Sequence, residues 1–226
     1  FPGQERFEFR AVFAASKEKI GDATNFGLPI RGKDTSLGLY FPYWDDFGRW
    51  YHVLYPTDDK IFRWRMGHMA YDYPIVLVDS KMYWGVGNYN SHTAIPSGKY
   101  QFSYLLHHEL GHFFGLNEEY EEPAPNRTEL TFAPGIYEPW SQNTTFLRAP
   151  EDLKWSHLID PNTPLPTPKN KWNSRAPIYG AYKGGYSSEP KLGHKPGYSC
   201  VMSSGRNFCP ICSHAIEAKV HKDLGE

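Results

Sequence analysis

Two histidines and a glutamate near the middle of the chain have the spacing of a metal-binding helix. The segment His107–His112 reads His-His-Glu-Leu-Gly-His, which places His108 and His112 four residues apart. Residues four apart share one face of an α-helix, so both imidazoles can bind one ion. Glu109 lies roughly 100° further round the helix, off the metal but within reach of a water that the metal holds. The spacing therefore predicts half of a metal site with Glu109 as general base.

A third ligand is predicted just beyond the helix, at Glu118. This residue follows His108 by ten positions, and a continuous helix would carry it about 15 Å along the axis, out of reach. Gly115 can adopt the left-handed conformation that ends a helix, which turns the following chain back. Glu119 is displaced by one residue, and we expect it to support the site by a hydrogen bond to a ligating histidine. A solvated acidic loop after a buried helix is the alternative interpretation.

Extended to Glu118, the motif reads His-Glu-x-x-His-x-x-Gly-x-x-Glu. It resembles the zinc motif of metzincin peptidases, with glutamate in place of their third histidine. Further along, the polar turn Ser199–Gly205 surrounds Met202 and resembles the metzincin Met-turn. In metzincins this methionine packs beneath the ligating histidines. The resemblance therefore gives Met202 a supporting role and not a ligand's role.

Several segments are similar, in order, to the IgA-peptidase family of metzincin-clan metallopeptidases. That family's zinc helix ends in Gly-Leu-x-acidic-Glu-Tyr, matched here by Gly115–Tyr120, although the family usually has Asp at the position of Glu118. The resemblance covers about residues 70–218, and the first seventy residues match only in strand character. Its remaining segments are Gly180–Tyr182 and Gly184–Tyr186, and the cysteine-bracketed turn formed by Cys200–Met202 and Phe208–Cys212.

This resemblance implies a zinc endopeptidase with one catalytic zinc ion and a protein or peptide substrate. Zinc held by two imidazoles and a carboxylate keeps one position for water, whose pKa falls to about 7. Glu109 would accept the proton and later return it to the leaving amine. We expect the substrate to lie antiparallel to the strand edge near residues 84–87. The candidates for stabilising the oxyanion are Tyr186 and Tyr198, between which the sequence does not choose.

Two other kinds of protein are compatible with parts of this pattern. A thermolysin-like enzyme would take its third-ligand glutamate from a separate helix. The sequence after Tyr120 contains no convincing helix of that kind. A carbohydrate- or protein-binding module with a structural zinc would suit the sixteen Tyr and seven Trp. Such a zinc would be closed by a fourth protein ligand and would not need Glu109.

The composition and the first residues of the chain limit the kinds of binding partner and the cellular location that we expect. The formal net charge is −1 and the pI is about 6.9, so we expect neither nucleic acid nor a membrane surface as partner. The chain opens on Phe1-Pro2-Gly3 without a leader pattern, and we expect a secreted monomer whose signal has been removed. Sequons at Asn126 and Asn143 would accept glycans in a eukaryotic secretory pathway.

Three cysteines, Cys200, Cys209 and Cys212, lie close together near the C-terminus. They could form one disulfide with one thiol left over, or donate three sulfurs to a metal. We favour the disulfide as the prediction.

We expect the strands and helices that position these residues to form an α+β fold of metzincin type, with one catalytic domain spanning 1–226. An upper lobe, 1–115, holds a twisted mixed sheet and the active-site helix, and an irregular lower lobe, 116–226, holds the third ligand, the Met-turn and a C-terminal helix. Apolar alternation and runs predict strands at 7–13, 74–78 (central and buried on both faces) and 84–86 (an edge). Three- and four-residue apolar steps predict helices over 100–114 and 210–220, with irregular chain over 121–190.

Overall fold

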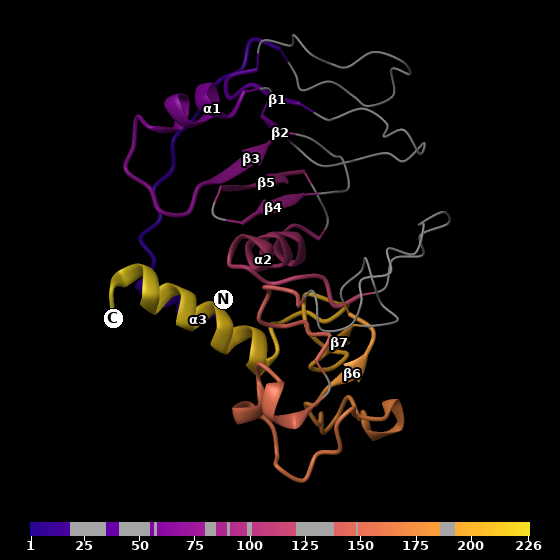
Figure 1. The fold of residues 1–226 in the computed structure, drawn as a ribbon. Helices are drawn as coiled ribbons and strands as arrows, with labels where there is room; N and C mark the ends of the chain where they lie inside the picture. Colours follow the sequence, from indigo (N-terminus) through magenta and orange to yellow (C-terminus); the bar gives the residue numbers. More distant parts are fainter. Residues whose placement is uncertain are drawn as a thin grey trace. The chain divides into compact units, whose positions relative to one another are not determined.

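A computed structural model of the chain (Figure 1) describes residues 1–18, 35–40, 55–56, 58–79, 85–89, 91–98, 101–120, 138–147, 149–185 and 193–226. The described chain combines α-helices with small β-sheets, which confirms the predicted α+β class. It divides into two compact units. We call Glu8–Phe113 the sheet unit, and Phe1–Phe7 with Phe114–Glu226 the cysteine unit.

The sheet unit is built on a mixed three-stranded sheet in the order β3-β5-β4. Strand β5 (His92–Pro96) pairs in parallel with β3 (Ile75–Val78) and antiparallel with β4 (Val86–Asn88). Every residue of β5 is buried, so β5 is the central strand of the described sheet. The strand predicted at 74–78 is present, but its predicted central place is wrong, because β3 ends the described sheet and Leu77 is 58% exposed.

One face of this sheet carries the apolar core of the unit. Val76 and Val86 are both register partners of Ala94, so the three side chains share a face. Helix α1 (Asp59–Met66) adds Phe62 to the same cluster, and Leu39 joins it from β1 (Leu39–Tyr40). Asp58 caps α1 by accepting from two backbone N–H groups, and β1 pairs antiparallel with β2 (Tyr55–Pro56).

Helix α2 (Phe102–Phe113) packs on strands β4 and β5 within the same unit (Figure 1). Leu105 and Phe113 are buried on this helix, as the predicted apolar stripe requires. The helix predicted over 100–114 is therefore confirmed, with ends that differ by one or two residues.

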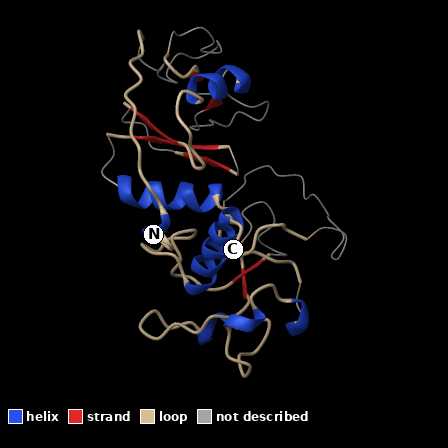
Figure 2. Cartoon of the chain, turned by 90° about the vertical axis from the view of Figure 1, so that its left-hand side faces the viewer, coloured by secondary structure: helices blue, strands red, loops and turns tan. Residues whose placement is uncertain are grey.

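The cysteine unit is mostly irregular chain, as predicted for 121–190 where that range is described (Figure 2). Its regular parts are the two-stranded β6 (Tyr182–Lys183) and β7 (His194–Lys195), helix α3 (Pro210–Leu224), and the short 3-10 turns η1 (Gln4–Arg6), η2 (Pro150–Asp152), η3 (Ser156–Leu158) and η4 (Lys169–Lys171). Helix α3 confirms the predicted C-terminal helix and runs four residues further. It ends at Gly225, which has a left-handed φ of 74°.

The first residues of the chain belong to the cysteine unit. The Phe1 ring lies edge-on to the Phe7 and Phe208 rings and 5.5 Å from that of Phe114. Arg6 pairs with Glu226 at 2.8 Å. The predicted strand at 7–13 is wrong, because residues 7–13 are irregular.

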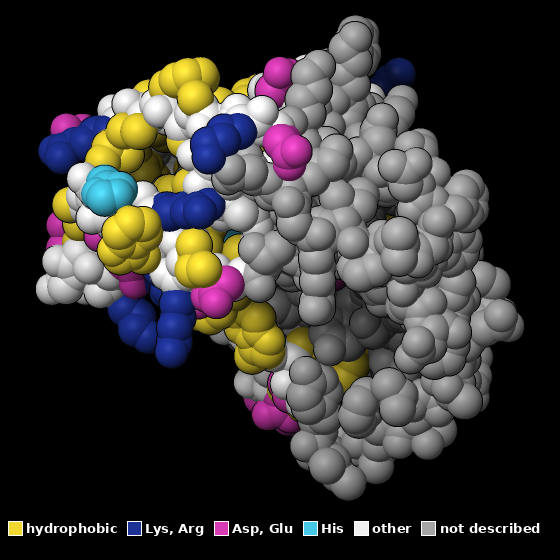
Figure 3. Space-filling model, turned by 90° about the horizontal axis from the view of Figure 1, so that it is seen from above, with side chains coloured by type: hydrophobic (Ala, Val, Ile, Leu, Met, Phe, Trp, Pro, Cys, Tyr) yellow, Lys and Arg dark blue, Asp and Glu magenta, His cyan; other side chains and the backbone are white. Residues whose placement is uncertain are grey.

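Surface side chains of the sheet unit mix apolar and basic types. Helix α1 exposes Ile61 and Trp64, and Figure 3 shows hydrophobic side chains interspersed with Lys and Arg on the coloured part of the surface seen from above.

Among the described residues, none of the helices combines the length and the apolar character needed to cross a membrane.

Candidate active site

Helix α2 brings the two predicted histidine ligands together. The Nε2 atoms of His108 and His112 lie 3.2 Å apart, and the two rings are almost perpendicular at 88°. A tetrahedral zinc with Zn–N bonds of 2.0–2.1 Å requires its two nitrogens to be about 3.3 Å apart. The two imidazoles therefore fit a shared zinc ion without rearrangement of the helix.

Burial differs across this part of the helix. His108 and Glu109 are each 7% exposed, whereas His112 is half-buried. The Tyr104 ring stacks on His108, with 5.8 Å between centroids and 24° between planes. This stacking fixes the plane of the His108 imidazole from the preceding turn of the helix.

Two glycines of the β4 region allow α2 to approach the sheet closely. A Cβ on Gly87 would lie 1.9 Å from the backbone oxygen of Glu109 and 2.9 Å from the Cβ of His112. A Cβ on Gly85 would lie 2.8 Å from Cγ of Glu109. The glycines therefore set the depth at which the predicted base and ligand sit on the sheet. The sequence signal was a Gly-x-Gly pair in a short strand, which marks a close backbone approach.

Beyond the helix, Gly115 has the predicted positive φ, at 91°. Glu118 lies in the cysteine unit, where its backbone N–H donates to the Asn117 side chain at 2.9 Å. Asn143 holds this segment, because its Oδ1 accepts from the Asn117 N–H and its Nδ2 donates to the Asn117 carbonyl, both at 2.8 Å. Asn143 is fully buried, so the second sequon cannot be glycosylated in the folded protein.

Met202 lies fully buried in a tight turn. The N–H groups of Ser203 and Gly205 both donate to the Cys200 carbonyl, at 2.9 and 2.8 Å. The Met202 carbonyl accepts from the Glu119 N–H at 2.8 Å. The turn is thus hydrogen-bonded directly to the residue after Glu118.

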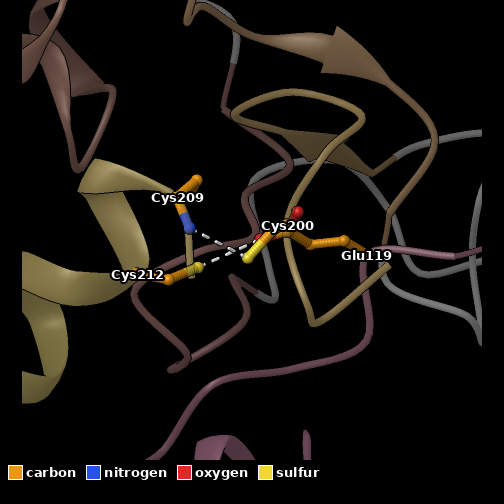
Figure 4. A group of neighbouring side chains, drawn as sticks. All are labelled: Glu119, Cys200, Cys209 and Cys212. Atoms are coloured by element: carbon orange, nitrogen blue, oxygen red, sulfur yellow. Dashed lines mark hydrogen bonds between the residues drawn. The ribbon is translucent and has the colours of Figure 1, made fainter. Parts of the chain in front are cut away.

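The Glu119 carboxylate has partners other than the histidine expected from the sequence. Its Oε1 accepts from Asn143 Nδ2 and from the Cys212 thiol, each at 3.1 Å. Cys200 and Cys209 complete the group, as Figure 4 shows. All three cysteines are free thiols, so the structure does not contain the predicted disulfide. Sequence reasoning missed Glu119 as a neighbour of the cysteines.

Of the two tyrosines predicted as oxyanion stabilisers, Tyr198 lies within the described residues and Tyr186 does not. Tyr198 is part of an aromatic group, with ring centroids 5.2 Å from Tyr182 and 5.7 Å from Trp172. Lys195 Nζ lies 4.7 Å from the Tyr198 ring centroid. Tyr186, like Trp84 of the predicted substrate edge, lies outside the described residues.

Comparison with known proteins gives one match at the level of the family. No curated protein matches the chain. The sequence profile described as IgA Peptidase M64 matches residues 1–177. The match includes the first seventy residues, for which the sequence resemblance gave no motif, and it ends before Cys200. Because it covers more than three quarters of the 226 residues, with the whole of α2 inside it, the chain belongs to the IgA peptidase M64 family and is a peptidase.

Proposed function

We propose that the protein is a zinc-dependent endopeptidase of metzincin type. In this proposal His108, His112 and Glu118 hold one catalytic zinc, Glu109 is the general base, and the turn around Met202 supports the site as a Met-turn. The observation that carries the proposal is the 3.2 Å separation of the two Nε2 atoms on α2. Family membership supplies the reaction, the hydrolysis of peptide bonds.

The donor set suits zinc, which binds imidazole nitrogen and carboxylate oxygen in fourfold coordination. Zinc held by three protein ligands lowers the pKa of water and polarises a carbonyl group. The chain's own residues carry out the proton transfers and hold the substrate.

In the proposed mechanism Glu109 moves the proton. It follows His108 on the helix, and its backbone is fixed against Gly87 of β4. Its carboxylate takes a proton from the attacking water and delivers it to the leaving amine nitrogen. Burial of Glu109 keeps bulk water away from this transfer and strengthens the electrostatic interactions around it.

Strand β4 offers a place for the substrate, because it lies at the end of the described sheet. An extended peptide can add to such an edge through main-chain hydrogen bonds. We place the substrate antiparallel to β4, with either Tyr186 or Tyr198 donating to the oxyanion. The whole chain is then one catalytic domain with lobes 1–115 and 116–226, secreted and acting as a monomer on proteins or peptides.

The test is peptide cleavage by the intact protein and by Glu109→Gln, followed by mass spectrometry on a denatured protein mixture. Gln has nearly the size of Glu but cannot accept the proton, so cleavage should fall by about 10²–10⁴-fold while the zinc at the histidines is retained. A variant that cuts as fast as the intact protein would refute the role of Glu109. Zinc bound at the histidines with no cleavage by the intact protein would favour a binding module that uses zinc structurally.

A further inference from the structure

We propose that Cys200, Cys209, Cys212 and Glu119 bind a second zinc ion, with a structural role. The four ligand atoms all lie within 4.8 Å of one another and all four side chains are buried. They come from three segments of the cysteine unit: the chain after Gly115, the Met202 turn, and the start of α3 (Figure 4). The inference does not rest on the proposed catalytic mechanism, in which none of these four residues is a ligand or the base.

The distances suit a single ion. Zinc binds thiolate at about 2.3 Å and carboxylate oxygen at about 2.0–2.2 Å, so a tetrahedral site holds its ligand atoms about 3.5–3.8 Å apart. The observed upper limit of 4.8 Å needs only a small contraction to reach this geometry. Three sulfurs and one oxygen supply the four ligands of a closed structural site.

Glu119 gives an independent indication that this group binds a cation. Its Oε2 atom is buried without a hydrogen-bond partner, and its side chain is 0% exposed. A buried carboxylate oxygen without a donor is costly, and a metal ion bound by it removes that cost.

Two of the three cysteines lie at the start of α3, the positive end of the helix dipole. Cys209 is the N-cap of this fifteen-residue helix and Cys212 lies in its first turn, where the helix dipole stabilises negative charge. A divalent ion bound there would displace the thiol protons.

The surroundings orient these ligands and offset their charge. The Cys209 N–H donates to Cys200 Sγ at 3.4 Å, and Asn143 fixes Glu119 Oε1; such contacts position metal ligands in proteins. Three thiolates and a carboxylate carry more negative charge than one Zn²⁺ neutralises. Lys195 is buried beside them and donates from Nζ to the Glu119 carbonyl, which supplies a compensating positive charge.

Two other fates of the cysteines fit less well. A disulfide between any two sulfurs would leave the third thiol and the unpartnered Glu119 oxygen buried together. An iron–sulfur cluster spreads its protein ligands over two or more irons, so some of those ligand atoms lie further apart than atoms that bind one ion. A single zinc ion uses all four groups.

The experiment measures zinc per chain by elemental analysis of the purified protein. We expect about two zinc ions in the intact protein and about one in the His108→Ala/His112→Ala variant. Loading that variant with Co²⁺ should give the thiolate-to-cobalt charge-transfer absorption of a sulfur-rich site. Adding Cys209→Ser and Cys212→Ser to the histidine variant should abolish this absorption. If the combined variant does not fold, X-ray absorption spectroscopy of the histidine variant identifies the sulfur ligands directly.

Two neighbouring glutamates give a matched pair of variants. Glu119→Gln should release zinc from the cysteines to a chelator at least tenfold faster than the intact protein, whereas Glu118→Gln should leave that release rate unchanged. The inference is overturned if the histidine variant binds no metal, if two cysteines form a disulfide in the purified protein, or if Glu119→Gln has no effect on the release rate.

Discussion

Gly87 lies so close to Glu109 that a Cβ on this glycine would be 1.9 Å from the Glu109 carbonyl oxygen. The same Cβ would be 2.8 Å from the Glu109 carbonyl carbon. Both neighbours are backbone atoms, so the overlap cannot be relieved by a side-chain rotation. The depth of α2 on the sheet is therefore set by a missing side chain on the neighbouring strand.

Gly87→Ala should accordingly displace α2 from the sheet. We expect a loss of about 1–3 kcal/mol in the free energy of unfolding and a fall of about 10²-fold in kcat/KM, since a displacement near 1 Å at a catalytic group has that effect. Thermal unfolding and peptide cleavage measure the two effects. Gly67→Ala is the control, because its nearest non-bonded atom is 3.2 Å away; equal losses in both variants would contradict the prediction.

Gly115→Ala should destabilise the turn that ends α2. The φ of 91° at Gly115 is unfavourable for a residue with a Cβ, and we expect a loss of about 1–2 kcal/mol. Gly115→Asn should lose less, because Asn tolerates positive φ better than Ala. Chemical denaturation of both variants tests this order, and an Ala variant as stable as the Asn variant would refute it.

Chelation should remove the two proposed zinc ions in sequence. His112 is half-buried, whereas Cys212 and Glu119 are fully buried. A chelator added to the native protein should therefore take the ion at the histidines first, and cleavage should stop while α-helical circular dichroism is unchanged. Release of the second ion should require unfolding. Loss of both ions in a single phase, with cleavage and helicity falling together, would contradict this order.

Lys154→Met should destabilise the segment before η2. Lys154 Nζ donates to the carbonyls of Ser141 and Thr144, each at 2.8 Å, and pairs with Glu138 at 2.9 Å. Removing the ammonium leaves these acceptors without their donor, and for this partly buried group we expect a loss of about 2–4 kcal/mol. Denaturant unfolding measures it, with Lys171→Met, at an exposed lysine, as the control that should change little.

The stabilising effect of Lys154 should also depend on pH. Burial lowers the pKa of Lys154 below its ordinary value of 10.5, against a smaller raising effect of Glu138. Between the lowered pKa and 10.5 the unfolded chain binds more protons than the folded chain, so stability rises with pH across this window. The stability difference between the intact protein and Lys154→Met should therefore grow as the pH is raised towards 10.5. A difference that shrinks would contradict the direction of the shift.

Both long helices with strong sequence signals were predictable. The apolar steps around Leu105 and Phe113 locate α2, and Gly115 correctly marks its end. Helix α3 runs past the predicted Val220 because apolar periodicity fades in its last turn, where the helix stops at Gly225 instead. Local pattern and backbone freedom determine these features, so one sequence is enough to find them.

The strands were less predictable, because burial and pairing depend on distant chain. Residues 7–13 alternate like a half-buried strand, yet Phe9 is 80% and Phe13 92% exposed. Strand β5 was missed, since His92–Pro96 is short and bounded by His and Pro, although it is buried throughout. Sheet contacts on both sides give β5 its central place, and periodicity does not contain that information.

The approach of the two histidines was predictable because both lie on one helix, four residues apart. His108, Glu109 and His112 follow from helical spacing alone. The contact between Glu119 and Cys212 cannot be predicted in this way, because it depends on how the chain after Gly115 packs against the start of α3. Long-range packing of this kind leaves no local pattern in a single sequence.

The division of the chain also sets an order of assembly during synthesis. The sheet unit is one continuous stretch, Glu8–Phe113, whereas the cysteine unit needs Phe1–Phe7 together with Phe114–Glu226. Domains fold as their residues leave the ribosome, so α2 can form on its sheet while Cys212 is still to be translated. The two proposed zinc sites would therefore form one after the other, with the histidine pair in place before the cysteines are made.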